Sequence, residues 1–212
     1  MGEVVVIRKM RPEDRRRIRE ICCQTGFGGE SIEPIFDDPE LFADLWSSYY
    51  TDFEPESAFV AEHIGEVVGY LLGCLDTRRY NRILFGRLAP RLLGRILTGR
   101  YHIGEKTRAY FRSLIAQLLR GEVVNPPLKE YPAHLHINIA AGCRRMGIGS
   151  LLMESYLAYL REKGVRGVHL GTSSLHTSAL PFYEKLGFQL FGKKPTLFLG
   201  KKIDSIAYVK RL

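Results

Sequence analysis

The sequence contains no run of about 18 consecutive apolar residues, the minimum length for a helix that crosses a membrane. Its first residues, MGEVVVIRKMRPEDRRR, contain neither an uninterrupted apolar stretch nor a small-residue cleavage site, so we expect no secretory signal. Internal repeats and low-complexity tracts are also missing. These absences predict a cytoplasmic protein without a membrane partner.

Cysteine is scarce, and its spacing argues against the usual cysteine-based sites. The four cysteines are Cys22, Cys23, Cys74 and Cys143, and no two of them form a Cys-x-x-Cys pair. Structural zinc sites commonly use such pairs, and disulfide frameworks belong to small secreted chains with many cysteines. We therefore expect four structural thiols and no metal site.

Acidic residues are scarce in one segment, which makes the charge uneven along the chain. Residues 77–131 contain ten arginines and two lysines against three glutamates, a net charge of +9, whereas the whole chain carries +8. This segment therefore holds the entire positive excess. Its apolar and basic residues recur at helical spacing, with Gly86, Pro90 and Gly94 interrupting the first helix.

The remaining residues predict an α/β chain. With 212 residues and 45% hydrophobic content, residues 1–212 suit one domain, into which the basic segment 77–131 is inserted. Strands are expected at 3–10, 57–76 (two strands around a turn at Ile64-Gly65), 133–141 and 167–173, and in the two C-terminal segments FQLFGKK and IDSIAYVKRL. Helices are expected at 12–26, 37–53, 145–163 and 176–187. Strands 133–141 and 167–173 are joined by a helix, so they should run parallel within a mixed sheet.

The turn GCRRMGIGSLLM, residues 142–153, has the character of a phosphate-binding loop. It lacks the Gly-Lys-Ser/Thr of a Walker loop and the third glycine of a dinucleotide fingerprint, and the next strand supplies no carboxylate for a ribose. Its pattern Arg144-x-x-Gly147-x-Gly149 leaves a strand and enters a helix, so backbone N–H groups and the helix dipole face one point. The absent side chains of the two glycines would let a pyrophosphate approach closely. An ordinary strand-to-helix connection is the alternative.

This turn resembles the acetyl-coenzyme A pyrophosphate loop of the GNAT superfamily of N-acetyltransferases. A second motif, ALPFYEKLGFQLFG at 179–192, looks like the closing helix and strand of that family. The resemblance covers residues 130–192 well, covers 3–76 by the order of elements only, and leaves out the insert 77–131. The strand PAHLHINI also resembles a bacterial subgroup with a His-x-His strand before the loop. The implied fold is a mixed, mostly antiparallel sheet with a central parallel crossover, flanked by helices.

The resemblance implies that acetyl-CoA is the cosubstrate and indicates which residues hold it. The backbone of Ile139 and Ala140 would contact the pantetheine arm, and Ile139 could polarise the thioester carbonyl. The pyrophosphate would be lined by Arg144, Arg145, Met146, Gly147, Ile148, Gly149 and Ser150, with Arg145 preferred over Arg144 for the charge contact. His176 stands where the family often has an asparagine, and it would either bond the pantetheine or join the catalytic group.

Acetyl transfer to an amine needs a base for the ammonium proton, stabilisation of the oxyanion and an acid for the thiolate. By resemblance, Tyr183 would donate to the departing sulfur, and its pKa of about 10 keeps it protonated at neutral pH. The alternative is a tyrosine that only packs in the core.

The base is expected on the strand before the loop. His134 and His136 alternate on one face of that strand with Asn138, and an imidazole pKa near 6.5 suits proton abstraction. We prefer His136, which lies nearer the expected thioester. Histidines that only satisfy the sheet are the alternative for either position, and Glu54 and Glu56 are weaker candidates for the base.

These residues predict an N-acetyltransferase that moves an acetyl group from acetyl-CoA to a primary amine, on a small molecule or a peptide, directly within a ternary complex. A catalytically silent CoA-binding domain is the alternative. The insert could be a solvated helix face, a lid over the acceptor, a homodimer contact or a nucleic-acid contact, although no RNA-binding signature occurs.

Overall fold

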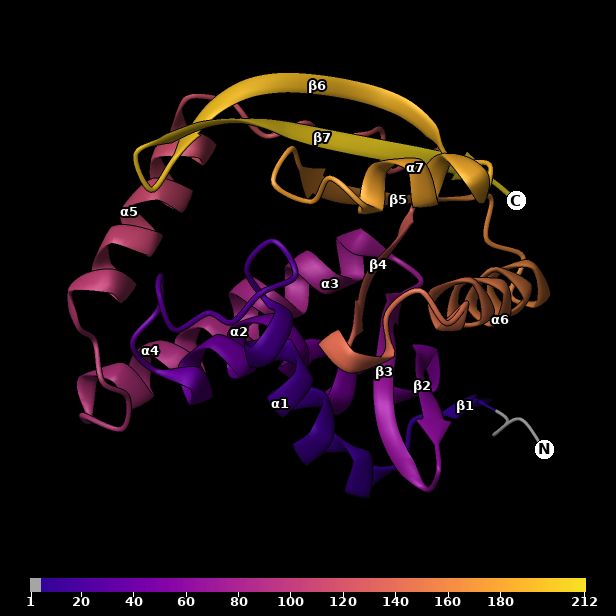
Figure 1. Cartoon of the computed structure of the whole chain (residues 1–212). Helices are drawn as coiled ribbons and strands as arrows, with labels where there is room; N and C mark the ends of the chain where they lie inside the picture. The colour runs from indigo at the N-terminus through magenta and orange to yellow at the C-terminus, as the bar shows by residue number, and fades with distance from the viewer. Residues whose placement is uncertain (1–4) are drawn as a thin grey trace.

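The computed structural model describes residues 5–212, which form one seven-stranded sheet with helices on both faces (Figure 1). The strands are β1 (Val6–Lys9), β2 (Ala58–His63), β3 (Glu66–Cys74), β4 (Ala133–Ile139), β5 (Gly167–Ser173), β6 (Gln189–Phe198) and β7 (Lys201–Arg211). They lie in the order β1-β2-β3-β4-β5-β7-β6. The predicted fold class is confirmed: β4 and β5 are parallel and every other neighbouring pair is antiparallel. The first two residues of the predicted strand 3–10 lie outside the described residues.

Seven α-helices accompany the sheet within the described residues: α1 (Arg15–Thr25), α2 (Pro39–Asp52), α3 (Thr77–Ile83), α4 (Ala89–Leu97), α5 (Glu105–Leu119), α6 (Ile148–Glu162) and α7 (Ala179–Lys185). Short 3-10 turns cover Pro12–Asp14, Pro55–Ser57 and Ala141–Cys143, and Leu84–Leu88 is a π-helical turn. The first residues of the predicted helix 145–163 belong to a turn instead. Arg145 and Gly147 have φ values of 63° and 77°, so the helix begins only at Ile148.

The two faces of the sheet are covered by different helices, and this separates two sides of β4. Leu135 belongs to the same buried cluster as Leu152 and Met153 of α6. On the opposite face, the ring of His136 lies 5.6 Å from the ring of Trp46 in α2. Because side chains alternate along a strand, β4 presents apolar residues to α6 and its histidines to α2.

The parallel pair β4–β5 stays together for only a short distance. The two strands are paired with each other at Ala133 with Val168 and at His134 with His169, and no further pair between them follows, although each stays paired with its other neighbour. Figure 1 shows β5, β6 and β7 turning away from the half of the sheet that holds β1 to β4. The backbone of β4 beyond His134 therefore has an open edge on the side where β5 departs.

The basic insert forms α3, α4 and α5, with a distortion where the sequence predicts one. Pro90 has no N–H to donate to the carbonyl of Gly86, and the chain makes the π-helical turn Leu84–Leu88 just before it, with Ala89 N–H donating to Leu84 O. The helix α5 then stands at the edge of the molecule between α4 and the β6–β7 hairpin (Figure 1). Its Ser113 hydroxyl accepts a hydrogen bond from Leu199 N–H at 3.1 Å.

No helix in the described part, residues 5–212, is long and apolar enough to cross a membrane.

Candidate functional site

The glycine turn between β4 and α6 presents a group of free backbone donors. Arg145 and Gly147 take left-handed φ values, and Gly147 is the N-cap of the 15-residue helix α6. In the described structure, the N–H groups of residues 145–149 donate to no protein acceptor, and Ser150 N–H is the first that does, to Gly147 O at 3.0 Å. Unpaired N–H groups at the positive end of a helix form an anion site.

The two glycines of the turn are needed for different reasons. A Cβ atom at Gly147 would meet nothing within 4 Å, so the space beside this residue is open to a ligand. A Cβ atom at Gly149 would lie 3.2 Å from the Phe182 ring of α7. The sequence predicts both glycines for the approach of a pyrophosphate, and the structure gives Gly149 a further reason, the packing of α6 against α7.

The two arginines of the turn have different surroundings. Arg144 Nε donates to Ile139 O at 3.3 Å, and Arg144 Nη2 donates to Gly29 O in the segment between α1 and α2. Gly29 has a φ of 92°, and a Cβ atom there would lie 3.3 Å from Arg144 Nη1. Arg145 is exposed and makes no hydrogen bond or ion pair to another described residue. Of the two arginines, Arg144 is therefore engaged by the protein and Arg145 is not, within the described residues.

His134 is buried in a chain of hydrogen bonds that uses both of its ring nitrogens. Its Nδ1 lies 2.7 Å from Thr77 Oγ1, and its Nε2 lies 2.9 Å from Tyr50 Oη. The single hydroxyl proton of Thr77 is donated to Pro132 O at 2.7 Å. Nδ1 must therefore carry the imidazole proton, and Nε2 accepts from Tyr50. Neither nitrogen is left for a substrate.

His136 is half-buried and makes no hydrogen bond to any other described residue. Its ring packs at 5.6 Å from Trp46 and 5.4 Å from Tyr50, both in α2. Burial lowers its pKa to about 4, so the imidazole is neutral at pH 7. Next along this face, Asn138 Nδ2 donates to Thr25 Oγ1 at 2.6 Å. The predicted row of polar residues therefore exists and faces α1 and α2, with His136 as its free imidazole.

Tyr183 lies on the other side of β4, in the cluster that also contains Ile148. It is buried against Phe182, Phe188 and Tyr208, with ring centroids between 5.3 and 6.0 Å away. Burial raises the pKa of Tyr183 to about 12, so the phenol keeps its proton at physiological pH. His176, in the segment between β5 and α7, is half-buried, and its pKa is lowered by burial.

The other predicted residues of the turn differ in what they expose. Ile148 is buried, so only its backbone faces the turn, whereas Met146 has 49% of its surface exposed. Ser150 is half-buried in the first turn of α6. Ala140 N–H donates to Val68 O in β3 at 2.9 Å, which holds the end of β4 in the sheet.

The two weaker base candidates, Glu54 and Glu56, differ in burial. Glu54 is fully buried and accepts hydrogen bonds from Tyr49 Oη at 2.7 Å, Ser57 Oγ at 2.9 Å and Leu75 N–H at 2.7 Å. Glu56 is exposed on the protein surface. Glu54 therefore ties the end of α2 to β3, which the sequence does not indicate.

Trp46 is a residue of this region that sequence reasoning missed. Its Nε1 is buried without a hydrogen-bond partner among the described residues. Its helical spacing with Tyr50 marks the inner face of α2, but only the fold brings that face against β4. Within residues 5–212, no group of three metal-ligating side chains is present, and all four cysteines are free thiols.

Because burial lowers the pKa of several histidines, we expect the free energy of unfolding to fall as the pH is lowered from about 6.5 to 4. In this window the unfolded chain takes up protons on imidazoles with a pKa near 6.5, whereas folded His136 stays neutral down to about pH 4. Burial also lowers the pKa of His134 and His169. Urea unfolding at several pH values should show a loss of about 2 to 3 kcal/mol from His136 at the acid end.

A His136→Asn variant should show a shallower dependence on pH, and a variant at the exposed His102 serves as the control. If the unfolding free energy of the wild type is equal at pH 6.5 and pH 4.5, the folded histidines titrate normally and the predicted burial effect is wrong.

Comparisons show that the chain is similar to known acetyltransferases. The model of the Acetyltransferase (GNAT) family matches residues 115–188, which include the strand β4, the glycine turn and Tyr183. "Probable N-acetyltransferase camello" of Xenopus laevis is 33% identical over 72 residues, which are 32% of this chain and 33% of that protein. A mouse relative, "Probable N-acetyltransferase family 8 member 5", is 35% identical over 88 residues, 41% of this chain and 39% of that protein. The chain thus matches between a third and two fifths of the length of these curated relatives.

A solved structure is similar over the whole chain. The crystal structure of SsHAT superposes with a TM-score of 0.77 at 30% identity and covers 98% of both chains, including the insert. The structure of yncA from Salmonella typhimurium with its cofactor acetyl-CoA has a TM-score of 0.59 at 14% identity, over 98% of this chain and 94% of that one, and shares the fold.

Proposed function

The chain belongs to the GNAT superfamily of N-acetyltransferases, and on that premise we propose that it moves the acetyl group of acetyl-CoA directly to a primary amine in a ternary complex. One observation carries this proposal. The free N–H groups of residues 145–149 lie at the end of β4, where β4 and β5 have separated. An anion site therefore lies next to an open strand edge. Coenzyme A needs both features, because its pyrophosphate would bind the anion site and its amide-bearing pantetheine arm would bond the strand edge.

The residues of the turn fit acetyl-CoA. The unpaired N–H groups and the open space beside Gly147 suit the pyrophosphate, and Arg145 is free to add a charge contact. Ala140 N–H points toward β3, so the N–H of its neighbour Ile139 points to the opposite edge, toward the opening. From there it would bond the pantetheine arm or polarise the thioester carbonyl. When bound, acetyl-CoA supplies the activated acetyl group.

His136 and Tyr183 would divide the proton transfers between the two faces of β4. On the α2 face, the neutral imidazole of His136 takes the proton of the ammonium, directly or through water. The amine then attacks the carbonyl carbon, the C–N bond forms, the attached nitrogen loses its second proton to water, and the C–S bond breaks. On the α6 face, the protonated phenol of Tyr183 gives its proton to the departing thiolate. The low pKa of His136 makes it a weak base, but it ensures that the neutral form is always available.

His134 supports this arrangement as a positioning residue. Its imidazole accepts from Tyr50 Oη, and the Tyr50 ring packs against His136. The chain from Thr77 through His134 to Tyr50 therefore fixes one wall beside His136. We propose this role in place of the base role that the sequence also allows for His134.

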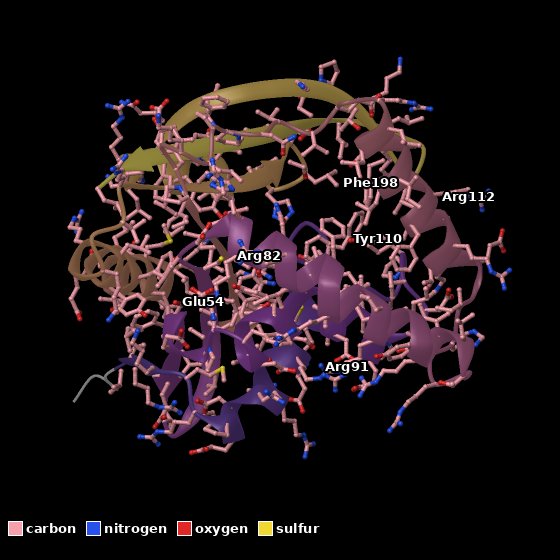
Figure 2. The ribbon with its side chains drawn as sticks, turned by 180° about the vertical axis from the view of Figure 1, so that it is seen from behind. Glu54, Arg82, Arg91, Tyr110, Arg112 and Phe198 are labelled. Carbon is pink, nitrogen blue, oxygen red and sulfur yellow. The ribbon has the colours of Figure 1, made fainter. Side chains whose placement is uncertain are left out.

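The insert would form one wall of the site for the amine acceptor. This corresponds to the interpretation of the insert as a lid, which the sequence allows. The Tyr110 ring of α5 lies 5.1 Å from Phe36, before α2, and 5.5 Å from Phe198 at the end of β6. Figure 2 shows Tyr110 and Phe198 together where α5 meets the hairpin. The insert thus connects the segment before α2 to the end of the β6–β7 hairpin, on the α2 side of the sheet.

Release of the coenzyme A thiol from acetyl-CoA in the presence of a panel of amines tests the proposed activity. We expect thiol release that depends on the amine and an acetylated amine in equal amount, identified by mass spectrometry. Binding of acetyl-CoA without release for any small amine, peptide N-terminus or lysine would instead identify a catalytically silent CoA-binding domain.

The two arginines of the turn should have separable effects. Replacing Arg145 with alanine should raise the KM for acetyl-CoA about tenfold with little change in kcat, because a charge-assisted contact contributes about 1.5 kcal/mol or more. Replacing Arg144 with alanine should mainly raise the KM for the amine, because Arg144 holds the segment of Gly29 against the end of β4. Steady-state kinetics with each substrate varied in turn would check both expectations. Equal effects of the two variants on acetyl-CoA would contradict the assignment.

A further inference from the structure

A second site is formed by a cavity of about 340 Å³ between α1, α2 and α4. It opens along the face of α2 that carries Asp44 and Ser48, and the residues of α2 that contact β4, Trp46 and Tyr50, are on the other face. Five arginines and three carboxylates line it, which leaves a net charge of +2: Arg15, Arg19, Arg91, Arg95 and Arg100 against Glu40, Asp44 and Asp52. Three arginines of the insert, Arg91, Arg95 and Arg100, therefore line a concave surface.

The carboxylates of this cavity are already occupied. Asp44 accepts from Arg19 at 2.5 Å, from Arg95 at 2.7 Å and from the Tyr101 hydroxyl. These bonds use both carboxylate oxygens and hold Arg19 and Arg95 in place. Glu40 has 75% of its side chain exposed, so it lies at the rim and contributes little to the field inside.

Two of the five guanidinium groups have no carboxylate within hydrogen-bond distance among the described residues. Arg91, on α4 (Figure 2), has Asp52 as its nearest carboxylate at 3.9 Å, and Arg15 already binds Asp52 at 2.5 Å. Arg100 forms no ion pair with any described residue. The buried side chains of Leu88 and Leu92 also line the cavity, and low-dielectric walls strengthen the field of nearby charges.

We propose that this cavity binds a small molecule through a phosphate monoester or a similar dianionic oxyanion group. A dianion matches the net charge of +2, and guanidinium groups bind such oxygens through paired hydrogen bonds. The volume lies at the lower end of the range for small-molecule sites. No residue of the turn 144–150 takes part, so the site is separate from the one proposed for acetyl-CoA. A ligand bound there would contact both α1 and α4 of the insert.

Calorimetric titration of the full chain with inorganic phosphate, against sodium chloride of equal ionic strength, tests this site. The titration is made on an Arg145→Ala background and repeated with saturating coenzyme A, so that phosphate binding at the glycine turn is excluded. We expect saturable binding of phosphate in both conditions. Replacing Arg91 and Arg100 together with glutamine should weaken it at least about tenfold.

Arg87→Gln is the matched control, because Arg87 is exposed on the same segment but does not line the cavity. It should leave the dissociation constant unchanged, and unfolding curves check that every variant folds. Phosphate heats no larger than those of chloride, or an Arg91/Arg100 variant that binds like the wild type, would overturn the proposal. Because the titration requires no acetyl transfer, its result is independent of the proposed activity.

Discussion

Replacement of Tyr183 with phenylalanine is expected to lower kcat about a hundredfold while the affinity for acetyl-CoA stays within about twofold, because a general acid contributes at least this much. The phenol is buried among Phe182, Phe188 and Tyr208, so removal of one oxygen leaves the packing intact. Turnover measured by thiol release, together with calorimetric binding of coenzyme A, separates the two quantities.

The pH dependence of the wild type gives a second measure of the same role. Since the pKa of Tyr183 is about 12, its ionisation should cause no fall in kcat up to about pH 10. An unshifted phenol with a pKa of about 10 would begin to lose its proton in that range.

Tyr159→Phe is the matched control for Tyr183→Phe. Its hydroxyl is buried without a hydrogen-bond partner in the described residues, and it lies in α6 rather than beside the proposed thioester. This variant should keep the wild-type kcat and be at least as stable. If Tyr183→Phe also keeps the wild-type kcat, the acid is another group or water, and Tyr183 only packs in the core.

Replacement of Glu54 with alanine is expected to destabilise the protein by about 3 to 5 kcal/mol, the largest stability effect that we predict for a single side chain. The substitution leaves three buried donors, Tyr49 Oη, Ser57 Oγ and Leu75 N–H, without the acceptor that they share. Urea unfolding at pH 7 would measure this loss, and thermal unfolding should show a lower midpoint.

Two variants control for the chemistry of this position. Glu54→Gln keeps one carbonyl oxygen and should lose clearly less stability than Glu54→Ala. Glu56→Ala, at an exposed position two residues away, should stay within about 0.5 kcal/mol of the wild type. A loss below about 1 kcal/mol for Glu54→Ala would show that water replaces the carboxylate, and its structural role would then be rejected.

The local features of this protein were predictable because short stretches of sequence decide them. The alternation of strands and helices follows from hydrophobic periodicity, and the hairpin turn at Ile64-Gly65 follows from a glycine that accepts a positive φ, although Ile64 also adopts a φ of 51° that its residue type does not favour. The end of β4, the glycine turn and the start of α6 are contiguous in the chain, so their order already indicated an anion site. Helix boundaries were less accurate, since Arg145 adopts a left-handed conformation that its residue type does not suggest.

The roles of individual side chains were decided by partners that are distant in sequence. Arg144 and Arg145 are adjacent, yet Arg144 is held by Gly29 O, 115 residues earlier, and Arg145 is left free. His134 and His136 look equivalent on one strand, but Tyr50, 84 residues before His134, occupies the ring nitrogen of that histidine. The basic insert showed only its charge in sequence, whereas packing divides its arginines between ion pairs with α2 and free donors in a cavity.

The sequence by itself indicated the family, the fold class and the glycine turn at the start of α6, because these depend on residues that lie close together along the chain. Tertiary structure alone decided which side chains are held by other residues, namely His134, Arg144 and Glu54. Whether a polar group is free depends on the atoms packed around it, and in a folded chain those atoms come from segments far away in sequence.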